Sequence, residues 1–459
     1  MMKQVLRAAL LTGFVRFGFC LLLLLQLIFP HAARAGFLYV YNETGNSIYG
    51  YSVNERTGAL TPLAGFPVAA GGAGSNSSFK TDLLNIDPVN NRLYVISDGS
   101  DRVNAYSINP ANGALTVLPF SPIQLPAGVY NSVQLNPSGS LLAVNELQNS
   151  TTRIYAITPT SATLSQTLPF NVSNEIASNT VFSRDGNYFY QIAGGGTFFR
   201  GFNVSQTTGL MTEMFGSPFS PSVGAGALTD SQGRIFGFFG SASPPIGRVF
   251  TTSQGVPAFV HQSPIANQIF ITTALHPNER YIAASASGNR VFSVRINGTG
   301  GGTTLMYAAD APSGGSNVRA LVFNQAGNFV FGGGNRISTF NFFGDTGNIT
   351  LNNVQPQEAN GFGNVPGIAY LPTGIPVYLS GRVTDAGGRP ISGARITATD
   401  TTRGAVQTAL SNPFGYYIFD ELILDRSYAV EVRQKQFAFA PQSLTTNQES
   451  HELNFSALP

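Results

Sequence analysis

The sequence predicts an all-β protein, a seven-bladed β-propeller followed by a small β-sandwich, on three observations. First, a segment of about 46 to 55 residues recurs seven times between Phe37 and Tyr370. Second, the chain holds 51 glycines, has Asn-rich turns and shows no sustained helical periodicity, which favours short strands joined by tight turns. Third, the pattern changes after Leu371, where six further short strands are expected.

Each repeat offers four short strands, as a propeller blade requires. In the third copy the first strand is 132–135, the turn is Asn136-Pro137-Ser138-Gly139, the second strand is 141–145 and the third is 153–157. Several copies end in a Gly-x-Leu-Thr-like fourth segment. The most regular part of the repeat is the second strand: Leu38-Tyr39-Val40, Leu93-Tyr94-Val95, Leu142-Ala143-Val144, Tyr188-Phe189-Tyr190, Ile235-Phe236-Gly237, Tyr281-Ile282-Ala283 and Phe329-Val330-Phe331.

The two ends of the repeat array complement each other. The first copy begins directly with its second strand, whereas the last copy is followed by a surplus first strand at 367–370. Pairing Phe37–Tyr41 with Gly367–Leu371 would close the ring and cover two strand edges that otherwise invite aggregation. We therefore expect a seventh sheet shared between the two ends.

The domain organisation follows from these patterns. We expect a propeller over residues 36–372, a Pro- and Gly-bearing linker over 373–376 and a β-sandwich over 377–459. The sandwich is predicted from alternating polar and apolar residues in about six short segments. These are Val377–Thr384, Ala394–Thr399, Ala405–Leu410, Tyr416–Phe419, Tyr428–Arg433 and Glu452–Phe455.

Residues 1–35 have the form of a secretory signal peptide. Basic residues precede an apolar run from Phe17 to Phe29, and Ala33-Arg34-Ala35 supplies small residues for cleavage. The run is shorter than the roughly 18 apolar residues of a membrane-spanning helix. We therefore expect an exported protein, periplasmic, extracellular or on the cell surface, with no membrane span once the leader is removed.

Composition narrows the possible functions. Cys20 is the only cysteine and lies in the leader, so the mature chain can form neither a disulfide nor a thiolate metal site. The leader also contains four basic residues and no acidic one, so its removal changes the formal net charge from +2 to −2. Without a basic field, nucleic-acid binding is not expected. No residue pattern predicts a metal or any other cofactor.

Residues 37–371 resemble the lactonase-like, or YVTN, seven-bladed propeller family. The resemblance is carried by Leu38–Glu43, by Asn145-Glu146-Leu147 with Tyr155-Ala156-Ile157, and by the repeated Gly-Ala-Leu-Thr. It implies an active-site face with Arg, His and Glu, where a cation stabilises an oxyanion and a second group moves protons. Glu146 matches the family's glutamate, whereas Val129-Tyr130-Asn131 replaces the expected Arg-His pair.

His276 is the second candidate catalytic residue, as a substitute base. It occupies a turn position that the other copies fill with Asp87, Asn136, Asp185, Asp230 and Asn324. Capping of that turn is therefore the competing interpretation.

The tail resembles the carboxypeptidase regulatory-like, transthyretin-like domain. The matching segments are Ser380–Asp385, Gly388-Arg389-Pro390-Ile391, Gly393-Ala394, Gly415–Phe419 with Leu422, and Tyr428-Ala429-Val430. Such a module implies no catalysis of its own; it implies a spacing, folding or adhesive role in a secreted protein.

Because the Arg-His pair is replaced, the sequence favours an exported binding or surface-interaction scaffold. It would hold an unidentified protein, peptide or glycan at the propeller face. The alternative is a lactone hydrolase of the 6-phosphogluconolactonase type in which Glu146 keeps a role, and a purely structural envelope protein is a third possibility.

Overall fold

In the residues that it describes, the computed structural model contains β-strands and one short 3-10 helix. It describes residues 36–74, 82–172, 177–193, 197–239, 246–264, 270–286, 289–298, 302–311, 318–352, 365–372, 376–401, 406–423, 426–446 and 450–458. The predicted signal peptide, residues 1–35, lies outside the described residues, as does most of the predicted linker. No helix in the described segments is long and apolar enough to cross a membrane.

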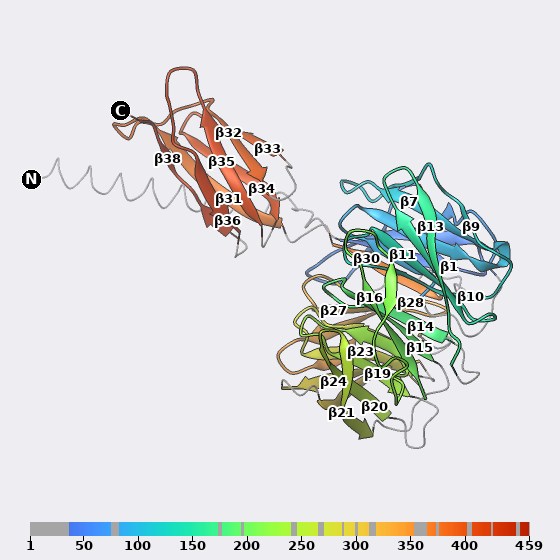
Figure 1. Ribbon diagram of the computed structural model, residues 1–459. Coiled ribbons are helices and arrows are strands. Elements are labelled where there is room, and N and C mark those ends of the chain that lie inside the picture. The colour runs from blue at the N-terminus through green and yellow to red at the C-terminus, as the bar shows by residue number, and fades with distance from the viewer. Residues whose placement is uncertain are drawn as a thin grey trace, which may run out of the picture.

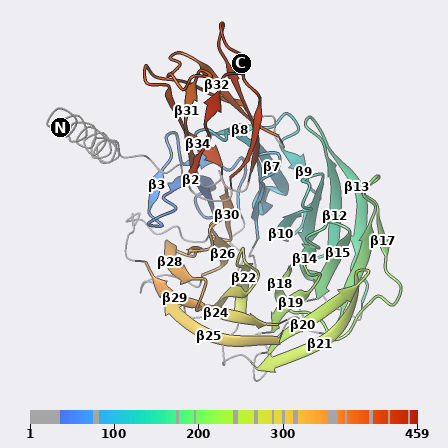
Figure 2. The ribbon, with the colours of Figure 1, turned by 90° about the vertical axis from the view of Figure 1, so that its left-hand side faces the viewer.

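Seven antiparallel sheets form the blades of the predicted propeller, arranged around a centre in Figures 1 and 2. In each blade the strands follow one another from the inside to the outside. The seven innermost strands contact one another in a closed cycle. They are β30 (Gly367–Leu371), β5 (Leu84–Asp87), β10 (Tyr130–Leu135), β14 (Ala177–Phe182), β18 (Ala225–Thr229), β22 (Phe270–Leu275) and β26 (Ala320–Phe323).

The second strands are the most deeply buried part of each blade, because they are covered on both faces by neighbouring blades. They correspond to the anchors predicted from the repeat. They are β1 (Phe37–Asn42), β6 (Arg92–Ser97), β11 (Leu141–Glu146), β15 (Tyr188–Ala193), β19 (Ile235–Phe239), β23 (Tyr281–Ala286) and β27 (Phe329–Gly333).

The third and fourth strands complete each blade. The third strands are β2 (Ser47–Val53), β7 (Arg102–Ile108), β12 (Thr151–Ile157), β16 (Phe199–Val204), β20 (Ile246–Ser253), β24 (Arg290–Asn297) and β28 (Ile337–Phe343). The fourth are β3 (Leu60–Pro62), β8 (Leu115–Val117), β13 (Ala162–Pro169), β17 (Met211–Glu213), β21 (Val256–Pro264), β25 (Gly302–Asp310) and β29 (Asn348–Leu351).

The first two blades each contain one additional short strand beside the fourth. β4 (Val68–Ala69) pairs with β2, and β9 (Ile123–Gln124) pairs with β7. The helix η1 (Asp98–Ser100) lies between β6 and β7.

Ring closure by the two predicted segments is confirmed, and they pair antiparallel. β1 pairs with β30 so that Phe37 faces Leu371 and Tyr41 faces Gly367. A further contact joins the two ends, because the Tyr370 hydroxyl donates to Glu55 in the turn after β2. Glu55 also accepts from the side chain of Asn324 in the last blade. The first and last segments of the propeller therefore hold each other in place.

The tail forms a sandwich of two sheets over one core, as predicted. One sheet contains β31 (Pro376–Thr384), β34 (Tyr416–Ile423), β37 (Ser450–Glu452) and β38 (Phe455–Ser456). The other contains β32 (Arg395–Asp400), β33 (Val406–Leu410), β35 (Ser427–Arg433) and β36 (Gln442–Thr445). β36 was not expected from the sequence, and Pro376, expected in the linker, begins β31. Proline is tolerated at the first residue of a strand.

Candidate functional site

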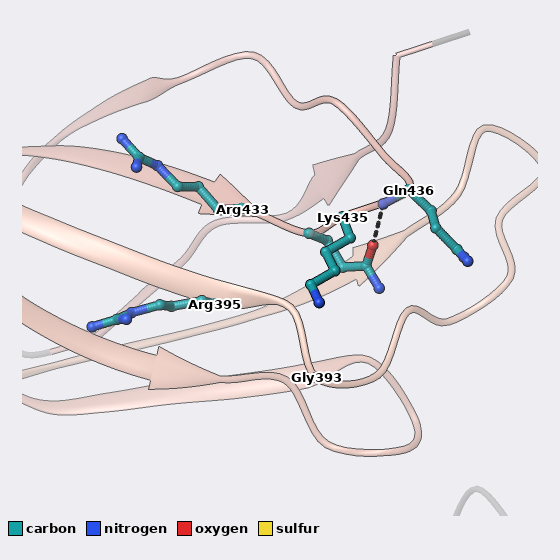
Figure 3. A pocket seen from close by; sticks show the side chains of 6 residues that line it. Gly393, Arg395, Arg433, Lys435 and Gln436 are labelled. Atoms are coloured by element: carbon teal, nitrogen blue, oxygen red, sulfur yellow. Dashed lines mark hydrogen bonds between the residues drawn. The ribbon is translucent and has the colours of Figure 1, made fainter.

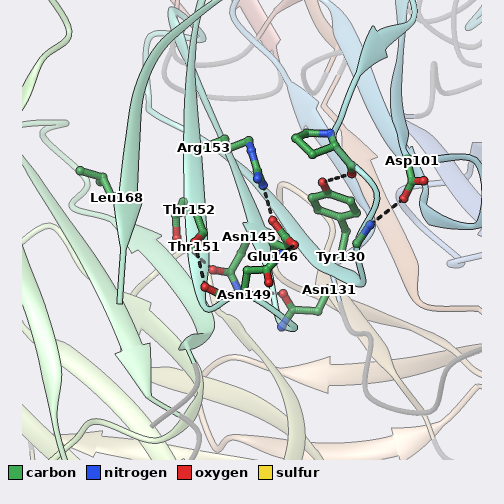
Figure 4. Close-up of polar contacts among 12 residues, drawn as sticks. Asp101, Tyr130, Asn131, Asn145, Glu146, Asn149, Thr151, Thr152, Arg153 and Leu168 are labelled. Carbon is green, nitrogen blue, oxygen red and sulfur yellow. Dashed lines mark hydrogen bonds and ion pairs between the residues drawn. The ribbon is translucent and has the colours of Figure 1, made fainter. Parts of the chain in front are cut away.

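Glu146 is the last residue of β11 and lies at the turn into β12 (Figure 4). Its side chain is fully buried. Nη1 of Arg153 donates to Oε2 at 2.5 Å, and Nδ2 of Asn149 donates to Oε1. Both carboxylate oxygens therefore already have protein partners.

The strand register explains why Arg153 reaches Glu146. Glu146 pairs with Thr151, and Arg153 follows two residues later on the same face of β12. The Arg153 side chain is only 12% exposed. Removing either member of such a pair leaves the other charge buried without compensation. The pair thus braces the hairpin between β11 and β12.

The segment that precedes β10 covers the Glu146 carboxylate. A Cβ added to Gly128 would lie 2.6 Å from Oε1 of Glu146, so the backbone here passes against the carboxylate. The amide of Gly128 donates to Oδ1 of Asp101 at 3.1 Å, and the Tyr130 hydroxyl donates to the carbonyl of Pro126 at 2.5 Å. Burial raises the pKa of Tyr130, which keeps this hydroxyl protonated.

A chain of buried side-chain hydrogen bonds runs beside this pair from the third blade to the fourth. Asn145 donates to Asn131 at 2.8 Å and accepts from Thr152 at 2.9 Å. Gln191 of β15 donates to Thr152 at 2.9 Å and to the carbonyl of Leu168 at 3.0 Å. These bonds fix the relative position of the two blades beside the Glu146 turn.

Tyr130 and Asn131, which stand where the resemblance implies Arg and His, therefore take part in packing and hydrogen bonding. The cation beside Glu146 comes instead from Arg153, which sequence reasoning did not select. The hairpin spacing could have identified Arg153. Four residues, 147–150, form the turn, so Thr151 pairs with Glu146, and Arg153, two residues further along β12, points to the same face of the sheet.

His276, the other candidate, lies on the opposite face of the propeller from Glu146. It follows β22 in the turn between first and second strands, whereas Glu146 lies in a turn between second and third strands. Strands in an antiparallel blade alternate in direction, so these two kinds of turn lie at opposite ends. The structure does not bring the two candidates together.

The bonds of His276 resemble those of a turn-capping residue. The amide of Asn278 donates to Nδ1 at 3.0 Å, so Nδ1 is the acceptor and Nε2 carries the proton. Nε2 lies 3.0 Å from the carbonyl of Gly327 and donates to it, which links the sixth and seventh blades. The ring is 4% exposed and packs on Phe323 and Phe342.

In the fourth blade the residue at the position of His276 is Ser183, and the expected equivalence with Asp185 is wrong. The amide of His276 donates to the carbonyl of Tyr281, and Asn324 makes the same bond to Phe329. In the fourth blade Ser183 makes that bond to Tyr188, so Ser183, and not Asp185, is the equivalent residue. The Ser183 hydroxyl donates to Asp185 at 2.5 Å. The Asp185 carboxylate therefore caps the turn from a position two residues after Ser183.

The environment of His276 predicts acid sensitivity. Burial lowers its pKa below the ordinary value near 6.5, and the two hydrogen bonds oppose this shift. His276 therefore binds a proton more readily in the unfolded chain than in the folded one. The stability that the neutral, buried ring contributes is present above about pH 6.5 and is lost as the pH falls towards the pKa of the folded state. We expect the unfolding temperature to drop from pH 7 to pH 5 by more in the wild type than in His276→Asn. Equal drops, measured by calorimetry, would contradict this assignment.

No group of three or more His, Cys, Asp or Glu side chains suited to a metal ion occurs in the part of the chain that the structure describes.

Comparisons with known families and structures agree with this architecture. Residues 27–178 match the model of the lactonase, 7-bladed beta-propeller family, and residues 378–457 match the carboxypeptidase regulatory-like domain. Both resemblances seen in the sequence are therefore confirmed. No curated protein matches the chain.

Solved structures share the propeller fold. A putative 6-phosphogluconolactonase from Bacteroides fragilis is 17% identical with a TM-score of 0.60. One from Bacteroides uniformis is 14% identical with a TM-score of 0.59, and a periplasmic gluconolactonase from Pseudomonas aeruginosa is 15% identical with a TM-score of 0.58. Each match covers 74% of this chain and 99% of the other. At such low identity the likeness establishes the fold alone.

Proposed function

We propose that this chain, a lactonase-type propeller followed by a carboxypeptidase regulatory-like domain, is an exported binding scaffold that recognises a hydroxyl-rich, glycan-like ligand on one propeller face. That face is formed by the turns between second and third strands, which we call the Glu146 face. In this proposal Glu146 braces the face and does not act as a catalytic residue.

The observation that carries the proposal is the state of the Glu146 carboxylate. A catalytic carboxylate must reach substrate or water, but this one is fully buried, with Arg153 and Asn149 on its two oxygens and Gly128 against it. Withdrawing it from Arg153 to serve as a base would leave a buried guanidinium without its counterion.

The turns on the Glu146 face favour a polar ligand. The first three blades expose Thr44-Gly45, Gly99 and Gln148-Asn149 there. None of the exposed large apolar side chains of the described propeller lies in a turn between second and third strands. Hydroxyl and amide groups without apolar neighbours suit a sugar surface better than a hydrophobic peptide.

Export belongs to the same proposal. Residues 1–35 have the composition of a signal peptide, and one structural neighbour is described as periplasmic. We place the propeller at 36–372, the linker at 373–376 and the second domain at 377–459.

A lactone hydrolase is the second candidate function, and Arg153 favours it. A cation beside a carboxylate on the Glu146 face resembles part of the machinery expected for lactone opening, and the solved neighbours include proteins described as gluconolactonases. This candidate requires Glu146 to become accessible when substrate binds.

The binding function is tested on a glycan array with the exported full chain. We expect saturable binding to at least one glycan and a loss of about tenfold or more in the double variant Thr44→Ala, Gln148→Ala. The matched control is Gln232→Ala, an exposed glutamine on the opposite face. Absence of binding to every glycan, or equal losses in both variants, would refute the proposal.

A further inference from the structure

A hollow of about 610 Å³ lies at one end of the sandwich, far along the chain from the Glu146 face. It is lined by Gly393, Arg395, Arg433, Gln434, Lys435 and Gln436 (Figure 3). Its volume is within the range of small-molecule sites. Three of its six lining residues are cations.

The sheet topology brings the two arginines to the same end of one sheet. β32 begins with Arg395 and β35 ends with Arg433; because the two strands are antiparallel, both residues lie at the same end of the sheet. The chain then turns through Gln434–Phe437, where the Phe437 amide donates to the carbonyl of Gln434. This turn brings Lys435 to the lining of the same hollow as the two arginines.

The strand register places two like charges directly opposite each other. Arg395 is the cross-strand partner of Arg433, and both are exposed on the outer face of the sheet. Like charges in this arrangement destabilise a sheet. Glu431 lies 3.5 Å from Arg433, but no described carboxylate lies within ion-pair distance of Arg395 or Lys435. The cluster therefore offers more positive charge than its surroundings neutralise.

The lining also limits the kind of anion that fits. It contains guanidinium, ammonium and amide groups but no apolar side chain; exposed Leu410 pairs across β32 from Arg395 and lies outside the lining. A guanidinium binds a carboxylate or phosphate through two parallel hydrogen bonds, and amides suit hydroxyl groups.

We propose that this hollow is a second binding site, which takes an acidic saccharide through its carboxylate or phosphate groups. Arg395 and Arg433 bind the oxyanion, and Lys435 adds a further charge. Oε1 of Gln434 accepts from the backbone amide of Gln436 at 2.7 Å, so Gln434 would donate to a hydroxyl group through Nε2, and the Gln436 side chain would contact a second hydroxyl group. The site lies outside the propeller and does not depend on the function proposed there.

The test is calorimetric titration of the full chain with tri-galacturonic acid, with glucose 6-phosphate and with neutral maltotriose. We expect binding of at least one acidic probe, none of maltotriose, and weakening at high salt because screening reduces charge attraction. Comparing the carboxylate and phosphate probes identifies which oxyanion is preferred.

The double variant Arg395→Gln, Arg433→Gln should weaken binding of the acidic probe at least tenfold. Its unfolding temperature should be unchanged or higher, because a like-charge contact is removed. The control is Arg389→Gln, whose side chain is 86% exposed on a turn of the same domain; it should bind as the wild type does. Failure of both acidic probes, equal loss in the control, or binding of a poly-glutamate peptide in place of the sugars would overturn the proposal.

Discussion

Replacing Glu146 by Gln is expected to lower the free energy of unfolding of the propeller by about 3 to 5 kcal/mol, the usual effect of removing one member of a buried ion pair. The variant keeps nearly the same shape but leaves the Arg153 guanidinium, 12% exposed, without its counterion. It also replaces an acceptor of the Asn149 side chain by an amide. Urea unfolding followed by far-ultraviolet circular dichroism measures the change.

A double variant separates the charge effect from packing. In Glu146→Met, Arg153→Met both charges are absent, and replacing a buried pair by apolar side chains of similar size is often nearly neutral. We therefore expect it to be more stable than Glu146→Gln alone. A loss below about 1 kcal/mol in Glu146→Gln would show that the carboxylate does not brace the hairpin.

Ring closure gives the second large effect. Ile368 of β30 is 6% exposed and lies opposite Val40 of β1 in a core that joins the first and last segments of the propeller. Ile368→Asp would bury an unpaired charge there, and we expect a loss of about 4 kcal/mol or more. The freed strand edge should also make β1 sensitive to limited proteolysis.

The control for ring closure is Val89→Asp, a substitution at a side chain that is 57% exposed on a turn of the second blade. It should change stability by no more than about 0.5 kcal/mol. If Ile368→Asp were as stable and as resistant to protease as this control, the pairing of β1 with β30 would not close the propeller.

Much of the fold could be predicted because the repeat combines strand periodicity with recurring turn residues. The pairing of Phe37–Tyr41 with Gly367–Leu371 followed from one strand missing at the start and one surplus at the end, and it is confirmed. The additional strands β4 and β9 were missed. Each is only two residues long, too short to show the alternation of polar and apolar residues that marks a strand.

The candidate site was harder to predict, because its contacts depend on strand register and on backbone proximity. Glu146 was selected from a motif, but its burial depends on Gly128 and on the segment before β10, which no motif describes. The contact between Arg153 and Glu146 follows only from the pairing of β11 with β12. Arg395 and Arg433 of the sandwich hollow likewise become neighbours through the register of β32 and β35, although they lie 38 positions apart in the chain.

Hydrolysis of aldonolactones and acyl lactones by the chain from Gly36 onward, with Glu146→Gln as the comparison, tests the central claim most directly. If Glu146 is a structural brace, neither protein opens the lactones faster than buffer, while the variant loses stability. Turnover by the wild type that disappears in a still-folded Glu146→Gln protein would contradict this account and identify the Glu146 face as a hydrolytic site.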